Sequence, residues 1–390
     1  MTNKINIFKQ FLIIAIVCFA ALQGFASSHD DVEGAEVVSH EHATDVAEHK
    51  EQPFDAGKMI MEHVADNHEW HLWGHTSIPL PIIIFNRNTG KLDAFLSSNF
   101  EHGTKAYKGY RLEENQITAG VELGLTSEDS IDLESTDSSE GLIDLSITKN
   151  VLAMLFSMAL MLYLFLTVAR SAKQNKGKAP KGLQSFIEPL IVFVRDDIAK
   201  PSIGKRYEYF MPFLLTVFFF IWINNMLGLI PFFPGGVNVT GSISVAMVLA
   251  VFTLLITFLV ANKHYWLHIF AMPGVPKPVL FILTPIEILG VFLRPFVLMI
   301  RLFANITAGH IIALAFFSLI FIFGEMNAGL GLGVSALSLV FTVFMGALEL
   351  LVAFLQAYVF TLLSAIYFGA AVDEGHEVHN HADDHLPAKH

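Results

Sequence analysis

Long apolar runs separated by short polar connections fill the chain from about residue 147 onward. Three of them, at 151–168, 210–230 and 242–260, hold 18 to 21 residues each. At about 1.5 Å per residue, a helix of that length crosses a hydrocarbon core of about 30 Å. The pattern therefore predicts an all-α polytopic membrane protein with about five membrane helices.

Two further apolar segments, 285–324 and 336–371, are too long for a simple crossing. The first begins like a helix, because Thr284 can cap it and Glu287 can reach back to that cap. Their 40 and 36 residues would reach about 60 Å and 54 Å, so each is either a tight hairpin or one strongly tilted helix. We favour two tilted helices, because the only clear turn signal is the glycine-rich stretch 328–333 between them.

Residues 180–200, between the first and second crossings, combine apolar and charged positions at helical spacing. The apolar positions are Phe186, Leu190, Ile191, Phe193 and Val194, and the charged ones are Glu188, Arg195, Asp196 and Asp197. This predicts an amphipathic helix that lies along the cytoplasmic interface of the membrane.

The first part of the chain follows a different pattern. Short β-prone runs at 78–85 and 91–96 flank a turn that contains Asn and Gly, and they predict a small β-hairpin. The acidic, Ser-rich stretch 129–140 is typical of a linker. The segment 68–75 reads H-E-W-H where a helical zinc site would need H-E-x-x-H, so we predict no metal site there.

Composition supports this division of the chain. Of its 390 residues, 53% are hydrophobic and 15% are charged, whereas a soluble chain carries about 25% charged residues. Residues 27–145 hold 24 acidic and 7 basic residues, and residues 146–372 hold 7 and 14. An acidic extension thus precedes a mildly basic membrane domain, and nothing outside the membrane loops favours nucleic acid as a partner.

The N-terminus has the layout of a secretory signal. Lys4 and Lys9 precede the apolar run 11–22, and the small residues Gly24 and Ala26 stand before a cleavage point at residue 27. We predict a signal peptide over 1–26, with an uncleaved anchor as the alternative. Cleavage would also remove the single cysteine of the chain, at position 18.

Basic residues predict the orientation in the membrane. Arg170 and four lysines up to Lys181 follow the first crossing, which marks that end as cytoplasmic. The extension 27–145 is then external, and the His-rich tail 373–390 is cytoplasmic. We expect a multi-pass protein of the cell inner membrane.

Ionisable side chains interrupt the two long segments, and such groups are costly in lipid and functional by default. Arg301 lies too deep to reach the interface easily, whereas Arg294 can extend to the cytoplasmic surface. Glu287 is either functional or the capping partner of Thr284.

The remaining polar residues of these segments also have two interpretations. His310 and Glu349 are either a proton-carrying pair or a buried pair that locks helices together. Gln356 shares a helix face with Glu349, seven residues before it, and is either part of the same path or a hydrogen-bonded link between helices.

Four stretches of residues 147–371 resemble one family, subunit a of the F-type ATP synthase, the static membrane subunit beside a rotating ring of c subunits. They are Arg301-Leu-Phe-Ala-Asn-Ile-Thr-Ala-Gly-His310, Leu355-Gln-Ala-Tyr-Val-Phe360, Asn225-Met-Leu-Gly-Leu-Ile-Pro231 and Val237-Asn-Val-Thr240. The extension 27–145 departs from the usual member, which has a short external terminus.

By this resemblance Arg301 is the family's essential arginine, with Asn305 and Gln356 as polar neighbours. An arginine stays charged, so it can attract a carboxylate of a passing c subunit and carry no proton itself. Each proton passing through about 100 mV supplies roughly 2.3 kcal/mol. The implied partners are the c ring, the b-subunit stalk, lipid and, indirectly, the F1 sector. No cofactor is implied, and the subunit alone is no enzyme.

The resemblance also implies two separate access paths for protons. His310 and Glu349 would line the external path, with the acid and the imidazole exchanged relative to many bacterial members. Glu287 would belong to the cytoplasmic path. Arg294 and Asn225 are secondary candidates.

Two other classes of protein would use intramembrane polar residues. A stand-alone secondary transporter or ion channel is the main alternative, but the early and late spans show no self-similarity of the kind that transporter repeats produce. An intramembrane hydrolase would need a motif such as H-E-x-x-H or G-x-S-x-G, and the sequence has neither.

Overall fold

The computed structural model describes residues 57, 66–73, 76–87, 90–100, 105–113, 116–119, 142–175, 177–230, 235–237, 239–270, 272, 275–326 and 328–373. The predicted signal peptide, the 129–140 linker and the tail after Asp373 lie outside these residues.

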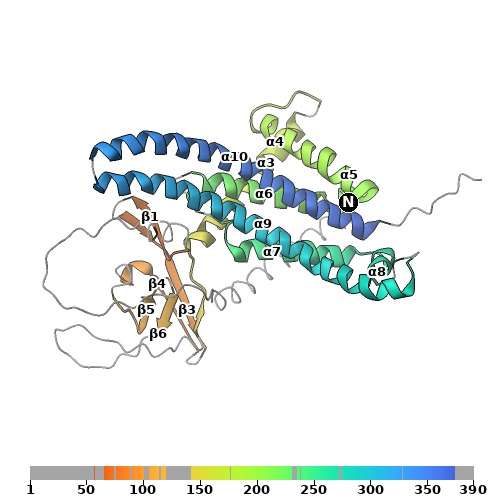
Figure 1. Cartoon of the computed structure of the whole chain (residues 1–390), viewed down its shortest axis with the longest axis horizontal. Coiled ribbons are helices and arrows are strands. Elements are labelled where there is room, and N and C mark those ends of the chain that lie inside the picture. The colour runs from red at the N-terminus through yellow and green to blue at the C-terminus, as the bar shows by residue number, and fades with distance from the viewer. Residues whose placement is uncertain are drawn as a thin grey trace, which may run out of the picture. The chain divides into compact units, whose positions relative to one another are not determined.

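Helices dominate the part of the chain that is described. The long ones are α3 (Lys149–Gln174), α6 (Tyr207–Gly228), α7 (Ile243–Val260), α9 (Lys277–Met326) and α10 (Ala328–Val372), and Figure 1 shows α9 and α10 as extended, unbroken ribbons. Short elements between them are α4 (Leu183–Phe193), the π-helical η2 (Val194–Ala199), α5 (Lys200–Ile203), η3 (Gly204–Arg206) and α8 (Lys263–Phe270). Five helical stretches of the described residues are long and apolar enough to cross a membrane, which confirms the predicted fold class.

The last two helices correct parts of the sequence prediction. They are single helices of 50 and 45 residues, so the hairpin alternative is wrong, while their tilt stays a prediction. α9 begins two turns before Thr284, whose hydroxyl donates to the carbonyl of Phe270 at 3.3 Å. Thr284 is therefore not a cap, and the capping role considered for Glu287 is wrong. α10 includes the glycines of 328–333 because a helix satisfies every backbone group within lipid.

The helices divide into two compact units. Unit 1 comprises 1–159, 224–244 and 305–352, and unit 2 comprises 160–223, 245–304 and 353–390.

Unit 1 contains three small antiparallel sheets ahead of α3, which we call the β-module (described residues 66–119 and 142–148). β1 (Glu69–Trp73) pairs with β2 (Thr76–Pro79), and β5 (Tyr110–Glu113) pairs with β6 (Gln116–Ala119). β3 (Pro81–Asn86) lies between β4 (Lys91–Leu96) and β7 (Leu142–Asp144), and Figure 1 shows β3 and β4 as neighbouring arrows. This pair confirms the predicted hairpin, while β7 was not predicted.

One face of the three-stranded sheet forms the core of the β-module. Ile82 and Ile84 of β3 are fully buried against Phe100, from the short helix η1 (Ser97–Phe100), and against Tyr110. Phe95 of β4 packs edge-on against Phe100, with ring centres 5.4 Å apart. The alternation of buried residues along β3 is what a sheet with one covered face produces.

Polar contacts fasten the β-module to the beginning of α3. The backbone N–H of Lys149 donates to the carbonyl of Asn67 at 3.0 Å, and that of Asn150 donates to the carboxylate of Asp66 at 3.1 Å. The N–H groups in the first turn of a helix have no acceptor within that helix. Asp66 and Asn67 provide acceptors for two of them. Part of the cap of α3 is therefore supplied from more than 80 residues away, while the hydroxyl of Thr148 accepts the N–H of Val151 locally at 3.4 Å.

A hydrogen-bonded pair of side chains lies beside this junction. The imidazole of His68 is 3.3 Å from the carboxylate of Asp144. Burial alone would raise the pKa of Asp144, but hydrogen bonds from His68 and Ser146 outweigh it and hold that pKa below its ordinary value. The strand that leads into α3 is thus held by its side chains as well as by its backbone.

In unit 2, α10 packs closely against the segment that joins η2 to α6. Phe210 and Phe368 stack with ring centres 4.9 Å apart. A Cβ atom at Gly369 would overlap the carbonyl oxygen of Ser202. Only glycine therefore allows this backbone approach.

We expect Gly369→Ala to lower the amount of folded protein in the membrane several-fold, because the methyl group would collide with backbone that cannot rotate away, and overpacking costs about 1–3 kcal/mol or more. Immunoblots of membranes and thermal unfolding of the purified chain would measure it. Gly346→Ala is the matched control on the same helix, since its Cβ would meet nothing within 4 Å. Equal amounts of both variants would contradict the prediction.

Candidate functional site

Arg301 lies on an outward, mostly apolar face of α9 in unit 2. Leu298 and Leu302, on the adjacent inward flank of the helix, are 1% and 0% exposed. Arg301 is exposed, together with its neighbours Val297 and Ile300. A permanent charge is thus presented on a surface that suits lipid or another apolar helix, and such a charge is costly there unless a counter-charge meets it.

Gln356 belongs to the inward face of α10 in the same unit. It is 3% exposed, and its neighbours Ala353 and Ala357 are also buried. The small alanines leave room for another helix to approach, as is usual where membrane helices pack. Gln356 is therefore an interior group, and that it faces Arg301 stays a prediction.

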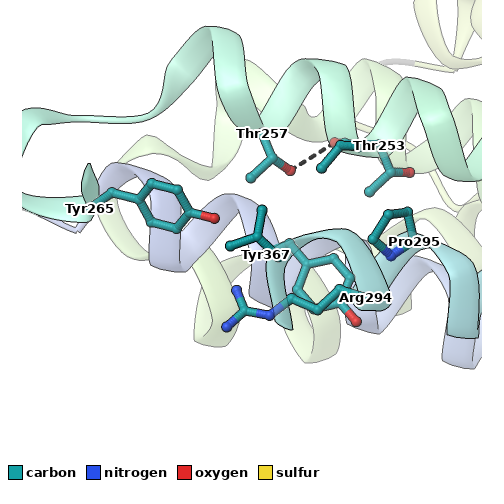
Figure 2. Close-up of a pocket in the computed structure, with 8 residues that line it drawn as sticks. Thr253, Thr257, Tyr265, Arg294, Pro295 and Tyr367 are labelled. Carbon is teal, nitrogen blue, oxygen red and sulfur yellow. Dashed lines mark hydrogen bonds between the residues drawn. The ribbon is translucent and has the colours of Figure 1, made fainter. Parts of the chain in front are cut away.

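Arg294 points into the helix packing of unit 2. Its guanidinium carbon lies 5.8 Å from the centre of the Tyr367 ring, a cation–π distance. Figure 2 shows both side chains at a small cavity that Thr253, Thr257 and Tyr265 also line. The space suits about one water molecule. That Arg294 extends to the cytoplasmic surface stays a prediction.

Tyr265 of α8 connects this cavity with Glu287. Burial raises the pKa of its hydroxyl, the charge of Arg294 lowers it, and the charge of Glu287 raises it again. Glu287, Tyr265 and Arg294 thus form one electrostatic group within unit 2. Tyr367 in turn interacts electrostatically with both Arg294 and Arg301.

The sequence did not single out Tyr265, Tyr367 or the two threonines. A tyrosine within an apolar run is an ordinary residue of a membrane helix, and only the packing of α7, α8 and α10 around Arg294 gives these hydroxyls a common position. The one available signal was Arg294 itself, because a buried cation needs polar or aromatic groups nearby.

Glu349 and Gly309 meet in unit 1. A Cβ atom at Gly309 would lie 3.0 Å from Oε1 of Glu349, so the carboxyl group rests against the backbone of α9. That oxygen is buried and finds no hydrogen-bond donor among the described residues. A buried polar atom without a partner is unfavourable, and it is a place where a water molecule or a proton can be taken up.

His310, the next residue of α9, lies beside the end of α6. Its Nε2 would be 3.6 Å from a Cβ atom at Gly228. Successive helical residues point about 100° apart, so Gly309 and His310 face different helices. The structure therefore places Glu349 and His310 in one region of unit 1, each against a glycine of a neighbouring helix.

Asn225 is buried in the last turn of α6, one turn before Gly228. Its amide oxygen accepts a hydrogen bond from the hydroxyl of Thr240. The hydroxyl of Thr307 donates to the carbonyl of Gly241 at 3.2 Å. These bonds hold the end of α6 and the start of α7 to α9. Asn305 is exposed.

Comparisons with known proteins agree on the membrane part. The family model described as ATP synthase A chain matches residues 151–369. A second model, described as a domain of unknown function, matches residues 59–145 and so covers the β-module.

Several curated proteins are similar over the same region. ATP synthase subunit a of Chloroherpeton thalassium is 42% identical over 252 residues, which cover 63% of this chain and 73% of that protein. ATP synthase subunit a 2 of Chlorobaculum tepidum is 45% identical over 247 residues, with 60% and 67% covered. ATP synthase subunit a of an Anaeromyxobacter species is 39% identical over 254 residues, with 63% and 58% covered.

Proposed function

Because the chain belongs to the ATP synthase A chain family, and thus to the membrane sector that translocates protons, we propose that it provides two offset access paths separated at Arg301. The observation that carries this is the position of Arg301 on an exposed, apolar face of α9. A c-subunit carboxylate that passes this face would supply the counter-charge. Arginine does not release its proton, so protons must leave and load on different sides of it.

Unit 1 would form the external path. Glu349 offers a buried oxygen without a hydrogen-bond partner in the described part of the chain, and His310 and Asn225 lie at the nearby end of α6. A carboxyl group and an imidazole can both take up and release protons in the physiological range. In this proposal they deliver protons from outside to the ring, with Asn305 on the exposed surface of α9.

Unit 2 would form the cytoplasmic path. Glu287, Tyr265 and Arg294 are electrostatically connected, and the cavity beside Arg294 suits one water molecule. In this proposal a proton released from the ring reaches the inner side through that cavity and Glu287. Gln356, buried in α10, would help to keep the two paths apart.

The proposed setting follows the family. The apolar face around Arg301 would contact the c ring, and the b-subunit stalk and the F1 sector would attach elsewhere in the complex. With the basic connection after α3 on the cytoplasmic side, the β-module is external and the C-terminus is cytoplasmic. The signal peptide over 1–26 remains part of this proposal.

We expect His310→Ala to slow proton uptake about tenfold, because a positioned acid–base group contributes about 10²–10⁴-fold to proton transfer and water replaces part of it. The measurement is potential-driven proton uptake by vesicles that contain the subunit with its c ring. Ser318→Ala is the control, since it also removes a polar group from α9 in unit 1, at a hydroxyl that donates to the carbonyl of Ala315 in its own helix. Unchanged uptake by His310→Ala from about pH 6 to 8 would assign the residue to packing alone.

A further inference from the structure

The sheet β4–β3–β7 of the β-module has a second apolar face. Ile82 and Ile84 point into the core, so the residues between them point the other way. The strand register and two further hydrogen bonds, from the N–H of Leu145 to the carbonyl of Ile83 and from the N–H of Ile147 to the carbonyl of Pro81, extend the pairing toward α3.

These pairings arrange the outward side chains in three rows across the sheet. The rows are Leu96–Pro81–Ile147, Ala94–Ile83–Leu145 and Leu92–Phe85–Ile143. All nine residues are apolar, and we call them the outer sheet face. Leu92, Leu96 and Leu145 are 62%, 48% and 47% exposed. An antiparallel sheet that faces water normally alternates apolar with polar residues, and a contiguous exposed apolar patch marks a contact surface.

The position of α3 indicates what covers this face. Ile147 stands two residues before Lys149, where α3 begins, so the nearest row lies within about 7 Å of chain from the membrane helix. The farthest row, at Ile143, is six residues, or about 20 Å, from it. The first rows therefore reach the headgroup layer, which adds about 5–7 Å on each side of the hydrocarbon core.

The junction with α3 prevents the β-module from drifting away from the membrane. Asp66 and Asn67 bind the first N–H groups of α3, and the pairing of Ile147 with Pro81 continues the sheet almost to that helix. α3 itself exposes Leu155 and Phe156, in its second turn. The outer sheet face is thus continuous along the chain with the surface that α3 offers to lipid.

We propose that the outer sheet face rests on phospholipid, in the leaflet at the N-terminal end of α3. That is the external leaflet in the orientation given above. The β-module would then be a membrane-surface domain whose apolar side lies among headgroups and upper acyl chains, as amphipathic surface helices do. The proposal does not depend on the roles of Arg301 or the proton-path residues.

Single nitroxide labels on the full chain test this proposal. The one cysteine, Cys18, is replaced in a Cys18→Ser background, and Leu92→Cys, Leu96→Cys and Ile143→Cys each receive a label. The chain is placed in nanodiscs of phosphatidylethanolamine and phosphatidylglycerol. Collision rates are compared for oxygen, which concentrates in lipid, and for a soluble nickel chelate. Lys105→Cys, at an exposed position outside the sheet, is the control.

The expected result is an oxygen-to-nickel ratio several-fold higher at the three face positions than at Lys105, and highest at Leu96 in the row nearest α3. A ratio equal to that at Lys105 would show a face open to water and overturn the proposal. Low collision rates with both reagents would show a face covered by protein and overturn it as well. The labelled positions are exposed in the parent chain, and matching thermal unfolding verifies that each variant folds.

Discussion

Replacement of Arg301 by alanine is expected to abolish proton-driven ATP synthesis while the subunit still assembles in the membrane. The side chain is exposed on α9, and the inward positions beside it are held by Leu298 and Leu302. Its loss therefore creates no cavity of the kind that destabilises a core. In the proposed mechanism, what disappears is the permanent charge that keeps a ring carboxylate ionised as it passes. Synthesis by inverted vesicles and immunoblots of the same membranes measure the two parts of the prediction.

Two further variants make the Arg301 result specific. Arg301→Lys keeps a charge, but an ammonium is compact and can deprotonate in apolar surroundings, so we expect synthesis to stay well below that of the parent chain. Arg294→Ala removes an arginine two turns earlier that lies over the Tyr367 ring, and we expect it to retain part of the synthesis. Coupled synthesis by Arg301→Ala would refute the proposed role. A passive proton leak in the same vesicles would support it, because the barrier between the paths would be open.

The membrane helices could be predicted well because each is determined by its own run of apolar residues. A run of about 20 apolar residues has few alternatives to a helix when every backbone group must be satisfied within lipid. The run predicted at 242–260 became α7, one residue shorter. Helix ends were predicted less well. α9 begins at Lys277, before the capping motif predicted at Thr284. The hydroxyl of Thr284 donates to the carbonyl of Phe270, a contact that the local sequence does not reveal.

The three-stranded sheet shows more clearly which parts of the fold the sequence could not predict. The β3–β4 hairpin could be predicted because a turn with Asn and Gly lies between its strands. β7 joins β3 from more than 50 residues away, and its three residues carry no signal that the periodicity of the sequence reveals. The outer sheet face gains its third column, Ile143, Leu145 and Ile147, only through this pairing, so the hairpin alone could not have indicated its full extent.

The residues of the candidate site also divide into those that the sequence predicted and those that it did not. Arg301, His310, Glu349 and Gln356 were predicted because they are polar side chains within long apolar segments, and the family resemblance suggested their roles. The surroundings of Arg294 were not found, because Tyr265 and Tyr367 come from two other helices. The contacts of Gly309 and Gly228 with ionisable side chains were also missed, since a glycine within an apolar run carries no sign of what lies against it.

Exchange of Glu349 for glutamine gives the second large expected effect, a loss of proton uptake of about tenfold or more. Glutamine has nearly the same shape as glutamate but carries no exchangeable acid proton, so the packing of α10 against α9 is kept while proton transfer is lost. Potential-driven uptake by vesicles containing the subunit and its c ring measures the rate, and membrane immunoblots follow assembly.

Gly309→Ala separates a proton-carrying Glu349 from one that only packs. Its methyl group would stand 3.0 Å from Oε1 of Glu349, whereas Gly324→Ala, the control on the same helix, would meet nothing within 4 Å. If Glu349 carries protons, Glu349→Gln slows uptake more than Gly309→Ala does, because the displaced carboxyl group can still titrate. If Glu349 only joins the helices, the crowded Gly309→Ala variant is the worse of the two, and Glu349→Gln transports like the parent chain from about pH 6 to 8. The order of these two variants therefore decides the role of the one buried carboxyl oxygen that lacks a hydrogen-bond partner in the described part of α10.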